Sequence, residues 1–219
     1  NFGSNSSRTR TLVIGVDKNY SDEISPIELM PEYSKEKTLF DVIGKMKSLK
    51  WGEYDSNDFF HSFRTYPNHM LSWIENLKQG ESAFNNENDQ LKPHRIVDNK
   101  LVINKSKNAD KYKRQVYSKV APCVHTRNDQ MASQNTIHPV DNRVFSIREL
   151  MHMMTIPDSF KWLDYDLSYL NKLSILEKQK ISKKEEMNIR QSIGEAVPTT
   201  IFRQIAIKIK KLLLLPKLT

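Results

Sequence analysis

The run TLVIGV at Thr11–Val16 is the feature that most constrains the fold of this chain. Its residues are apolar at consecutive positions, as in a strand that is buried on both faces of a sheet. Such a strand needs hydrogen-bonding neighbours, and no second run of this character follows nearby. We therefore predict a strand at residues 11–16 that needs a partner to complete its sheet, for example a second copy in a packed or domain-swapped dimer.

Several classes of enzyme site are excluded by what the sequence lacks. The six glycines never lie near one another, so neither a G-x-G-x-x-G loop nor a Walker A loop is present. The histidines form no H-E-x-x-H metal motif, and no G-x-S-x-G nucleophile turn occurs. Cys123 is the single cysteine, which excludes an intrachain disulfide and a zinc knuckle and favours a reducing, cytoplasmic location.

The charge balance favours an anionic partner. The 219 residues carry a formal net charge of +8, which indicates nucleic acid first and a membrane surface second. An ordinary basic protein remains an alternative reading of the charge alone. The apolar C-terminal stretch IAIKIKKLLLLP is broken by Lys208, Lys210 and Lys211 and is too short to span a membrane, so no membrane partner is expected.

Local patterns predict four helices, one hairpin and two loop-like regions. Thr38 with Asp41, and Ser146 with Glu149, have the spacing of capping boxes, so each pair should begin a helix. Asp98-Asn99 between two apolar runs indicates a hairpin turn. We expect helices near 38–50, 69–77, 146–154 and 198–213, a hairpin at 95–103, an exposed loop at 80–94, and a poorly specified helix or mobile insertion at 163–188.

Three segments, read in order, resemble the C-terminal part of a cytosine-C5 DNA methyltransferase. FGSNSSRTRTLVIGV resembles the motif VIII of that family, IHPVDNRVFSIRELMHMMTIPDSF resembles motif IX, and RQSIGEAVPTTIFRQIA resembles motif X. The order of the motifs and the variable region between VIII and IX are also those of the family. Two departures are Asn5-Ser6, where Pro-Gln is usual, and Glu195, where Asn is usual.

The resemblance implies an α+β chain that holds a target-recognition domain and the last elements of an α/β methyltransferase domain. The expected divisions are a motif VIII strand and linker at 1–34, the target-recognition domain at 35–135, motif IX at 136–162, a variable polar insertion at 163–188, and motif X with its helix at 189–219. Motif IX would brace the recognition domain, with Arg143, Arg148 and Glu149 forming a structural polar network. A surface capping box with an incidental arginine is the alternative.

The family flips a cytosine out of duplex DNA, attacks it with a cysteine, and transfers a methyl group from S-adenosylmethionine. Its nucleophile loop (P-C-Q), its glutamate motif (E-N-V) and its Gly-rich cofactor loop all precede motif VIII, and none is present here. Cys123 lacks the following Gln and lies after motif VIII, so we interpret it as a small, half-buried residue. S-adenosylmethionine would then be bound mainly by the missing N-terminal part.

The resemblance also assigns site residues to this chain. Arg10 would contact the flipped cytosine and Arg8 the nearby backbone, although a basic strand edge would look the same. Gly194, Glu195 and Ala196 would line the cofactor pocket from its far side. In the variable region, we predict phosphate contacts and base readout, with a solvated polar loop as the alternative. The candidates for phosphate contact are Lys111, Lys113 and Arg114. The candidates for base readout are Arg127, Asn128 and Gln130 in the polar segment His125–Asn135, and His125 is a further DNA-binding candidate.

The sequence therefore predicts target recognition for DNA cytosine-5 methylation, in a bacterial restriction–modification system. The partners would be double-stranded DNA and the N-terminal catalytic half of the enzyme. The chain alone should not methylate, and its Asn start favours an excised fragment over a natural subunit. Two alternatives are a non-enzymatic DNA-binding module that has lost its catalytic half, and a generic basic protein bound to RNA or to an acidic partner.

Overall fold

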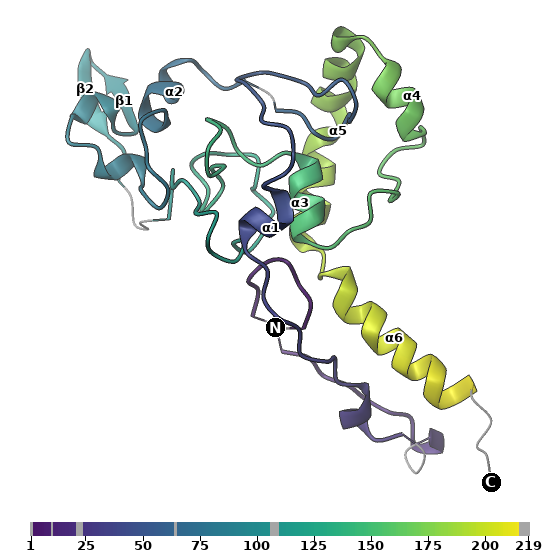
Figure 1. The fold of residues 1–219 in the computed structure, drawn as a ribbon. Helices are drawn as coiled ribbons and strands as arrows, with labels where there is room; N and C mark the ends of the chain where they lie inside the picture. Colours follow the sequence, from purple (N-terminus) through teal and green to yellow (C-terminus); the bar gives the residue numbers. More distant parts are fainter. Residues whose placement is uncertain (1, 10, 21–23, 64, 106–109, 215–219) are drawn as a thin grey trace.

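The computed structural model describes residues 2–214 except positions 10, 21–23, 64 and 106–109. Helices form most of the regular structure of this part, and its one sheet has two strands. Figure 1 shows the hairpin at one end of the body, helices α4 and α5 at the other end, and α6 extending away from it. This mixture of helices with a small sheet fits the expected α+β class.

The first two helices form where the sequence predicts them, but they are shorter. α1 spans Leu39–Ile43, and α2 spans His69–Ile74. At the start of α1, the Asp41 carboxylate accepts the Thr38 backbone N–H at 2.8 Å, and the Thr38 hydroxyl accepts the Asp41 N–H at 3.2 Å. The predicted capping box is therefore confirmed, and α1 buries Leu39 and Ile43 beneath it.

The predicted hairpin is also confirmed. β1 (His94–Val97) pairs antiparallel with β2 (Lys100–Ile103), and Ile96 lies opposite Leu101. The two turn residues, Asp98 and Asn99, have φ angles of 49° and 59°. Positive φ at both central residues matches the twist of the strands, and Asp and Asn tolerate this conformation better than most residues do.

The C-terminal half is more helical than the sequence indicates. α3 spans Ile147–Met153 and begins at the Ser146 capping box, as predicted. In the region expected to be poorly specified, α4 covers Leu167–Lys172 and α5 runs without interruption over Ile175–Glu195. Of the two alternatives for residues 163–188, the structure supports the helix, and Leu170 of α4 is buried in the core. α6 covers Thr199–Leu214, close to the predicted range.

Two hydrophobic cores meet at the segment before α3. One core contains residues of α1, α3, α4 and α5, and the other contains Trp73 and Ile74 of α2. Ile137 and Val144 belong to the second core, whereas Phe145 and Ile147 belong to the first. Residues 137–147 therefore join the two cores, and their bracing of a recognition domain stays a prediction.

The region at 80–94 is not simply an exposed loop. It contains 3₁₀ turns at Ala83–Asn85 and Asp89–Leu91, and Ala83 is fully buried in the second core. The Asn86 side-chain amide donates to the carbonyl of Leu91 at 2.7 Å. These local contacts give the segment a fixed conformation beneath the hairpin.

The N-terminal segment does not form the predicted strand. Residues 11–17 have no strand pairing within the described part of the chain, and Val13 is 85% exposed. The only described sheet is the hairpin, which lies at the other side of the body (Figure 1). The prediction is thus wrong for this chain by itself, because an apolar run becomes a strand only where a neighbouring strand accepts its hydrogen bonds.

The helix α6 packs against residues of the N-terminal segment. The Gln204 side-chain amide donates to the carbonyl of Phe2, and its carbonyl oxygen accepts the Glu32 N–H at 2.8 Å. Ile205 of α6 is buried, whereas Ile209 is 37% exposed. Within the described residues, no helix combines the length and apolar character that a membrane crossing requires.

Candidate nucleic-acid interface

Arg143 holds the centre of a buried polar network. Its two terminal nitrogens each donate to a carboxylate oxygen of Glu149 at 2.7 Å, and it also donates to Asp141 at 2.7 Å. All three residues are buried, so the charges compensate one another where water does not. Burial opposes ionisation of Glu149, but the adjacent Arg143 outweighs it and holds the pKa of Glu149 well below its usual range.

His138 occupies the same network in its neutral form. Its Nδ1 accepts the backbone N–H of Asp141 at 2.9 Å and that of Val140 at 3.3 Å. Burial lowers the pKa of His138 to about 4, although the nearby Glu149 favours the charged form. At neutral pH the uncharged ring therefore accepts hydrogen bonds through Nδ1. Its Nε2 lies 3.6 Å from a carboxylate oxygen of Glu149 but forms no ion pair with it.

Arg148 makes a separate set of contacts. Its Nε donates to Asp58 at 2.6 Å, a second nitrogen donates to Asp58 at 3.0 Å, and a third donates to Asp158 at 3.0 Å. Its backbone N–H also donates to the carbonyl of Phe60. The three predicted network residues therefore divide into two groups: Arg143 with Glu149, and Arg148 with Asp58. The second group links α3 to the preceding variable region.

Arg114 cannot contact a phosphate in this structure. Its side chain lies in the interior, and one terminal nitrogen donates at 3.0 Å to each of the carbonyls of His138, Val140 and Asp141. The other nitrogen donates to the carbonyl of Ile74 at 2.7 Å. The predicted phosphate contact is therefore wrong for Arg114, because the guanidinium is used to satisfy buried backbone oxygens.

The neighbouring lysines remain accessible. Lys113 forms an ion pair with Asp110 at 2.9 Å, and its side chain is 32% exposed. Lys111 is half-buried, and its backbone carbonyl accepts the Ser82 hydroxyl at 2.7 Å. Both are held on a defined backbone while their amino groups remain near water, as phosphate contacts require.

In the predicted base-reading segment His125–Asn135, the turn at 125–130 is fixed by contacts on its buried side. Asn128 is buried, and its amide donates to the carbonyls of His125 and Arg190. Arg190 in turn donates to the Asn128 side-chain oxygen at 3.2 Å and to the carbonyl of Phe145 at 2.9 Å. The prediction that Asn128 reads a base is therefore wrong, because its amide is already used on both sides.

The other side chains of the segment lie nearer the surface. Arg127 is 58% exposed and is oriented by Asp129, whose carboxylate lies 3.3 Å from its Nε. His125 and Gln130 are half-buried. The backbone of Gln130 is fixed by the Thr136 hydroxyl, which donates to its carbonyl at 2.8 Å. The structure thus brings Arg127, His125 and Gln130 together on one fixed turn.

Gly194 explains how closely α5 approaches this turn. A Cβ atom at Gly194 would lie 2.5 Å from backbone atoms of His125 and Thr126, so only glycine fits. The side of Gly194 where a Cβ would stand is therefore occupied by the chain itself, and a cofactor contact at Gly194 stays a prediction. Of the other predicted cofactor residues, Glu195 is exposed and accepts a hydrogen bond from Gln191 at 2.9 Å, and Ala196 ends the helix.

The Arg8 side chain links the N-terminal segment to Gly194 on α5. Its Nη1 donates to the carbonyl of Gly194 at 3.1 Å, and its buried Nε has no hydrogen-bond partner among the described residues. Arg10 lies outside the described residues. Nearby, the Ser7 N–H donates to the carbonyl of Ala121 at 2.8 Å, two residues before the half-buried, free Cys123.

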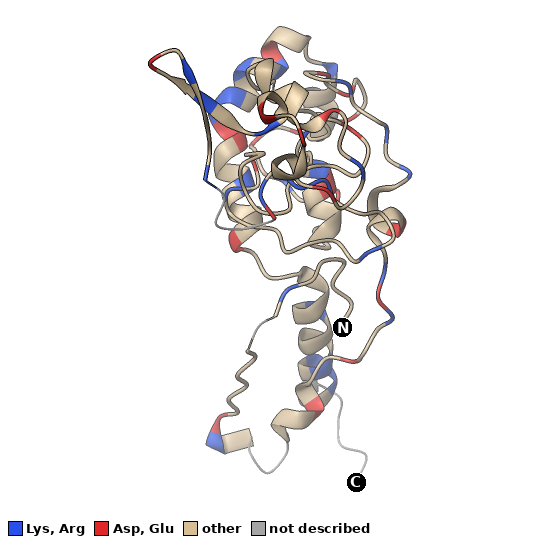
Figure 2. Ribbon diagram, turned by 90° about the vertical axis from the view of Figure 1, so that its left-hand side faces the viewer, with Lys and Arg blue, Asp and Glu red and all other residues tan. Residues whose placement is uncertain are grey.

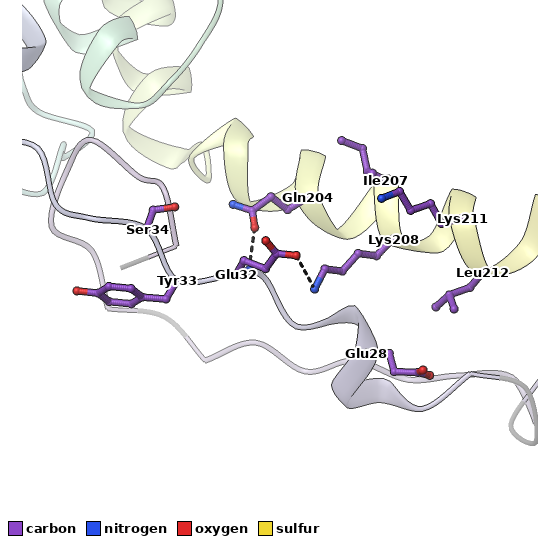
Figure 3. Close-up of a pocket in the computed structure, with 9 residues that line it drawn as sticks. All are labelled: Glu28, Glu32, Tyr33, Ser34, Gln204, Ile207, Lys208, Lys211 and Leu212. Atoms are coloured by element: carbon purple, nitrogen blue, oxygen red, sulfur yellow. Dashed lines mark hydrogen bonds and ion pairs between the residues drawn. The ribbon is translucent and has the colours of Figure 1, made fainter.

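An open groove of about 490 Å³ lies elsewhere, between residues 28–34 and α6. Figure 3 shows Lys208 directed at Glu32, 3.5 Å away, and Gln204 beside the Glu32 backbone. None of the predicted site residues lines this groove. Within the described residues, no cluster of His, Cys, Asp and Glu side chains is arranged to hold a metal ion.

Several important residues were missed in the sequence analysis. Arg190 stands four residues before Gly194 in the segment that resembles motif X, and Asp141 stands two residues before Arg143. Both lie within segments that resemble motifs of the family, and this resemblance was the signal that could have identified them. Asp58, the partner of Arg148, lies 90 residues away in sequence, so no local pattern could have identified it.

Comparisons with known proteins identify a family for this chain. The family model of C-5 cytosine-specific DNA methylases matches residues 1–211. The chain is also similar to the Type II methyltransferase M1.HgaI of Avibacterium volantium, with 27% identity over 173 residues. These residues make up 75% of this chain and 42% of that protein, so the matched part spans less than half of the relative.

Proposed function

Because the chain belongs to the C-5 cytosine-specific DNA methylase family, we propose that it supplies target recognition, and part of the active site, of a DNA (cytosine-5)-methyltransferase. The observation that carries this proposal is the turn at 125–130. Its backbone is locked by the Asn128–Arg190 contacts, whereas the Arg127 side chain remains exposed. A fixed backbone that displays an arginine suits the reading of guanine in the major groove.

The position of the turn supports the same function. Arg8 and the turn both contact Gly194, from the segment that resembles motif VIII and from the variable region, respectively. A base flipped toward Arg8 would therefore lie next to the residues that read its neighbours. Such proximity is what an enzyme needs when it selects one cytosine within a short sequence.

The family uses S-adenosylmethionine as its methyl donor. Gly194, Glu195 and Ala196 would line the cofactor pocket from its far side, while the Cβ side of Gly194 packs on the 125–130 turn. We assign the main cofactor contacts, the cysteine nucleophile and the catalytic glutamate to a catalytic half outside this sequence. The chain alone should then bind duplex DNA selectively and transfer no methyl group, within a restriction–modification system.

The division between readout and phosphate contact gives a direct test. A duplex selected by the chain from a random library should bind the Arg127→Ala variant about 10- to 100-fold more weakly, with relaxed preference at one base pair. Lys113→Ala should instead weaken binding to all duplexes and reduce the salt slope by about one. Fluorescence anisotropy across a salt series measures both effects.

Arg203→Ala is the matched control, because Arg203 is exposed on α6, away from the turn. This variant should keep both the affinity and the base preference. Equal behaviour of Arg127→Ala and Lys113→Ala would contradict the proposed division. Failure of the unaltered chain to select any duplex, with or without a catalytic half, would contradict the function itself.

A further inference from the structure

The β1–β2 hairpin projects from the body as an arm that is exposed on both faces. Figure 2 shows it extending outward from the molecule, with basic positions along its strands. Ile96 is 63% exposed, and Val97, Leu101 and Val102 are each 37–42% exposed. Exposed aliphatic side chains on both faces of a two-stranded ribbon are available to contact a partner.

The two faces of the ribbon differ in chemistry. Residues that lie opposite each other in an antiparallel pair share a face, so Ile96 and Leu101 form one apolar face near the tip. The other face mixes Arg95 and Lys100 with two valines. Lys105 is exposed at the base, and Asp98 is the only acidic residue of the arm. The surface of the arm therefore carries both basic and apolar side chains.

The arm is held firmly at its base. The His94 ring packs edge-to-face on the buried Trp73 ring, with 5.5 Å between the ring centroids. The Asn104 N–H donates to the carbonyl of Pro93 at 2.8 Å, which closes the ribbon where it leaves the body. An anchored ribbon loses little conformational freedom when its tip binds a partner.

A DNA groove suits this shape better than a protein surface does. A flat partner would cover one face and leave the apolar side chains of the other face in water, whereas groove walls contact both. Four-residue strands are about 13 Å long, and the major groove is about 12 Å wide and 8.5 Å deep, so a two-stranded ribbon can enter it. Aliphatic side chains can contact thymine methyl groups there, and Arg95 and Lys100 can neutralise phosphates.

We propose that the hairpin inserts into the major groove on the flank of the sequence that the chain recognises. This inference rests on the proposed function, since it requires that the chain binds duplex DNA. The arm would extend the recognised or contacted DNA beyond the base pairs near the 125–130 turn. It would also add phosphate contacts that hold the duplex in register while the target base is reached.

Dimethyl sulfate protection of guanine N7, a major-groove atom, tests the proposal. The probe is the duplex selected by the chain, with guanines placed throughout both flanks. The unaltered chain should protect N7 atoms in one flank as well as in the central site. The double variants Arg95→Ala/Lys100→Ala and Ile96→Ser/Leu101→Ser should each lose the flank protection and keep the central protection. Removal of the two cations should also reduce the salt slope by about two.

The control is Lys183→Ala/Arg203→Ala, which removes the same charge from exposed positions on α5 and α6. It should keep the flank protection. Flank protection that survives in both hairpin variants would overturn the proposal even if the chain still selects its duplex. Weaker association with a catalytic subunit, together with intact flank protection, would also overturn it and assign the arm to a protein contact. Absence of any selected duplex would refute the proposed function first, and the hairpin proposal with it.

Discussion

At the scale of single residues, three arginines that look alike in the sequence have different tasks. Arg143 neutralises two buried carboxylates, Arg114 satisfies buried carbonyls, and Arg127 remains at the surface. Removal of one partner from a buried pair such as Arg143–Glu149 leaves a charge without compensation and typically costs about 3–5 kcal/mol. Of these three, Arg127 alone has an exposed guanidinium that can meet a base.

The neutral, buried His138 predicts a pH dependence of stability. Its pKa is about 4 in the folded protein and near 6.5 when exposed, so the unfolded state binds more protons between these values. The free energy of unfolding should therefore fall as the pH is lowered from about 7 to about 4, by up to about 3 kcal/mol from this residue.

Urea denaturation at a series of pH values measures this effect. His138→Asn keeps an acceptor near Nδ1 and removes the titration, so this variant should show a shallower loss of stability over that range. An unchanged slope in His138→Asn would mean that other groups control the acid sensitivity. His69→Asn, at an exposed position on α2, is the matched control and should keep the slope of the unaltered chain.

At the scale of elements, local chemistry predicted some features well. The capping boxes at Thr38 and Ser146 and the Asp98-Asn99 turn each depend on neighbouring residues, and all three form as expected. The strand at 11–16 was wrong, and the choice between a helix and a mobile insertion at 163–188 was left open, because the structure of both segments depends on distant partners. The same limit applies to the site: Asn128 and Arg114 have residue types suited to DNA, but tertiary contacts bury them.

The packing of α5 against the 125–130 turn predicts an unusual response to alanine. Gly→Ala within a helix usually stabilises a protein by up to about 1 kcal/mol. Gly194→Ala should instead destabilise by about 1–3 kcal/mol, because its Cβ would meet the backbone of His125 and Thr126. It should also weaken selective DNA binding by displacing the turn.

Gly15→Ala is the control for this prediction, since a Cβ at Gly15 would meet no atom within 4 Å. It should leave stability within about 0.5 kcal/mol of the unaltered chain. Denaturant midpoints and duplex affinities of the two variants are the measurements. A Gly194→Ala variant as stable and selective as Gly15→Ala would show that the turn does not depend on α5.

At the scale of the whole molecule, the chain is a body with two hydrophobic cores, joined to segments that face outward. Residues 137–147 connect its two cores, while the N-terminal segment and α6 extend away from them (Figure 1). The exposed apolar run at 11–16 is understandable if a catalytic domain completes its sheet. The central claim is that this chain determines where a cytosine-5 methyltransferase acts.

Bisulfite sequencing of the native host genome tests that claim most directly. Two strains are compared, one intact and one without the coding stretch for residues 8–209. The account predicts that 5-methylcytosine disappears from one short sequence motif, at all of its genomic copies, and is kept elsewhere. An unchanged methylation pattern would contradict it and would leave a DNA-binding module without methylation as the explanation of the fold.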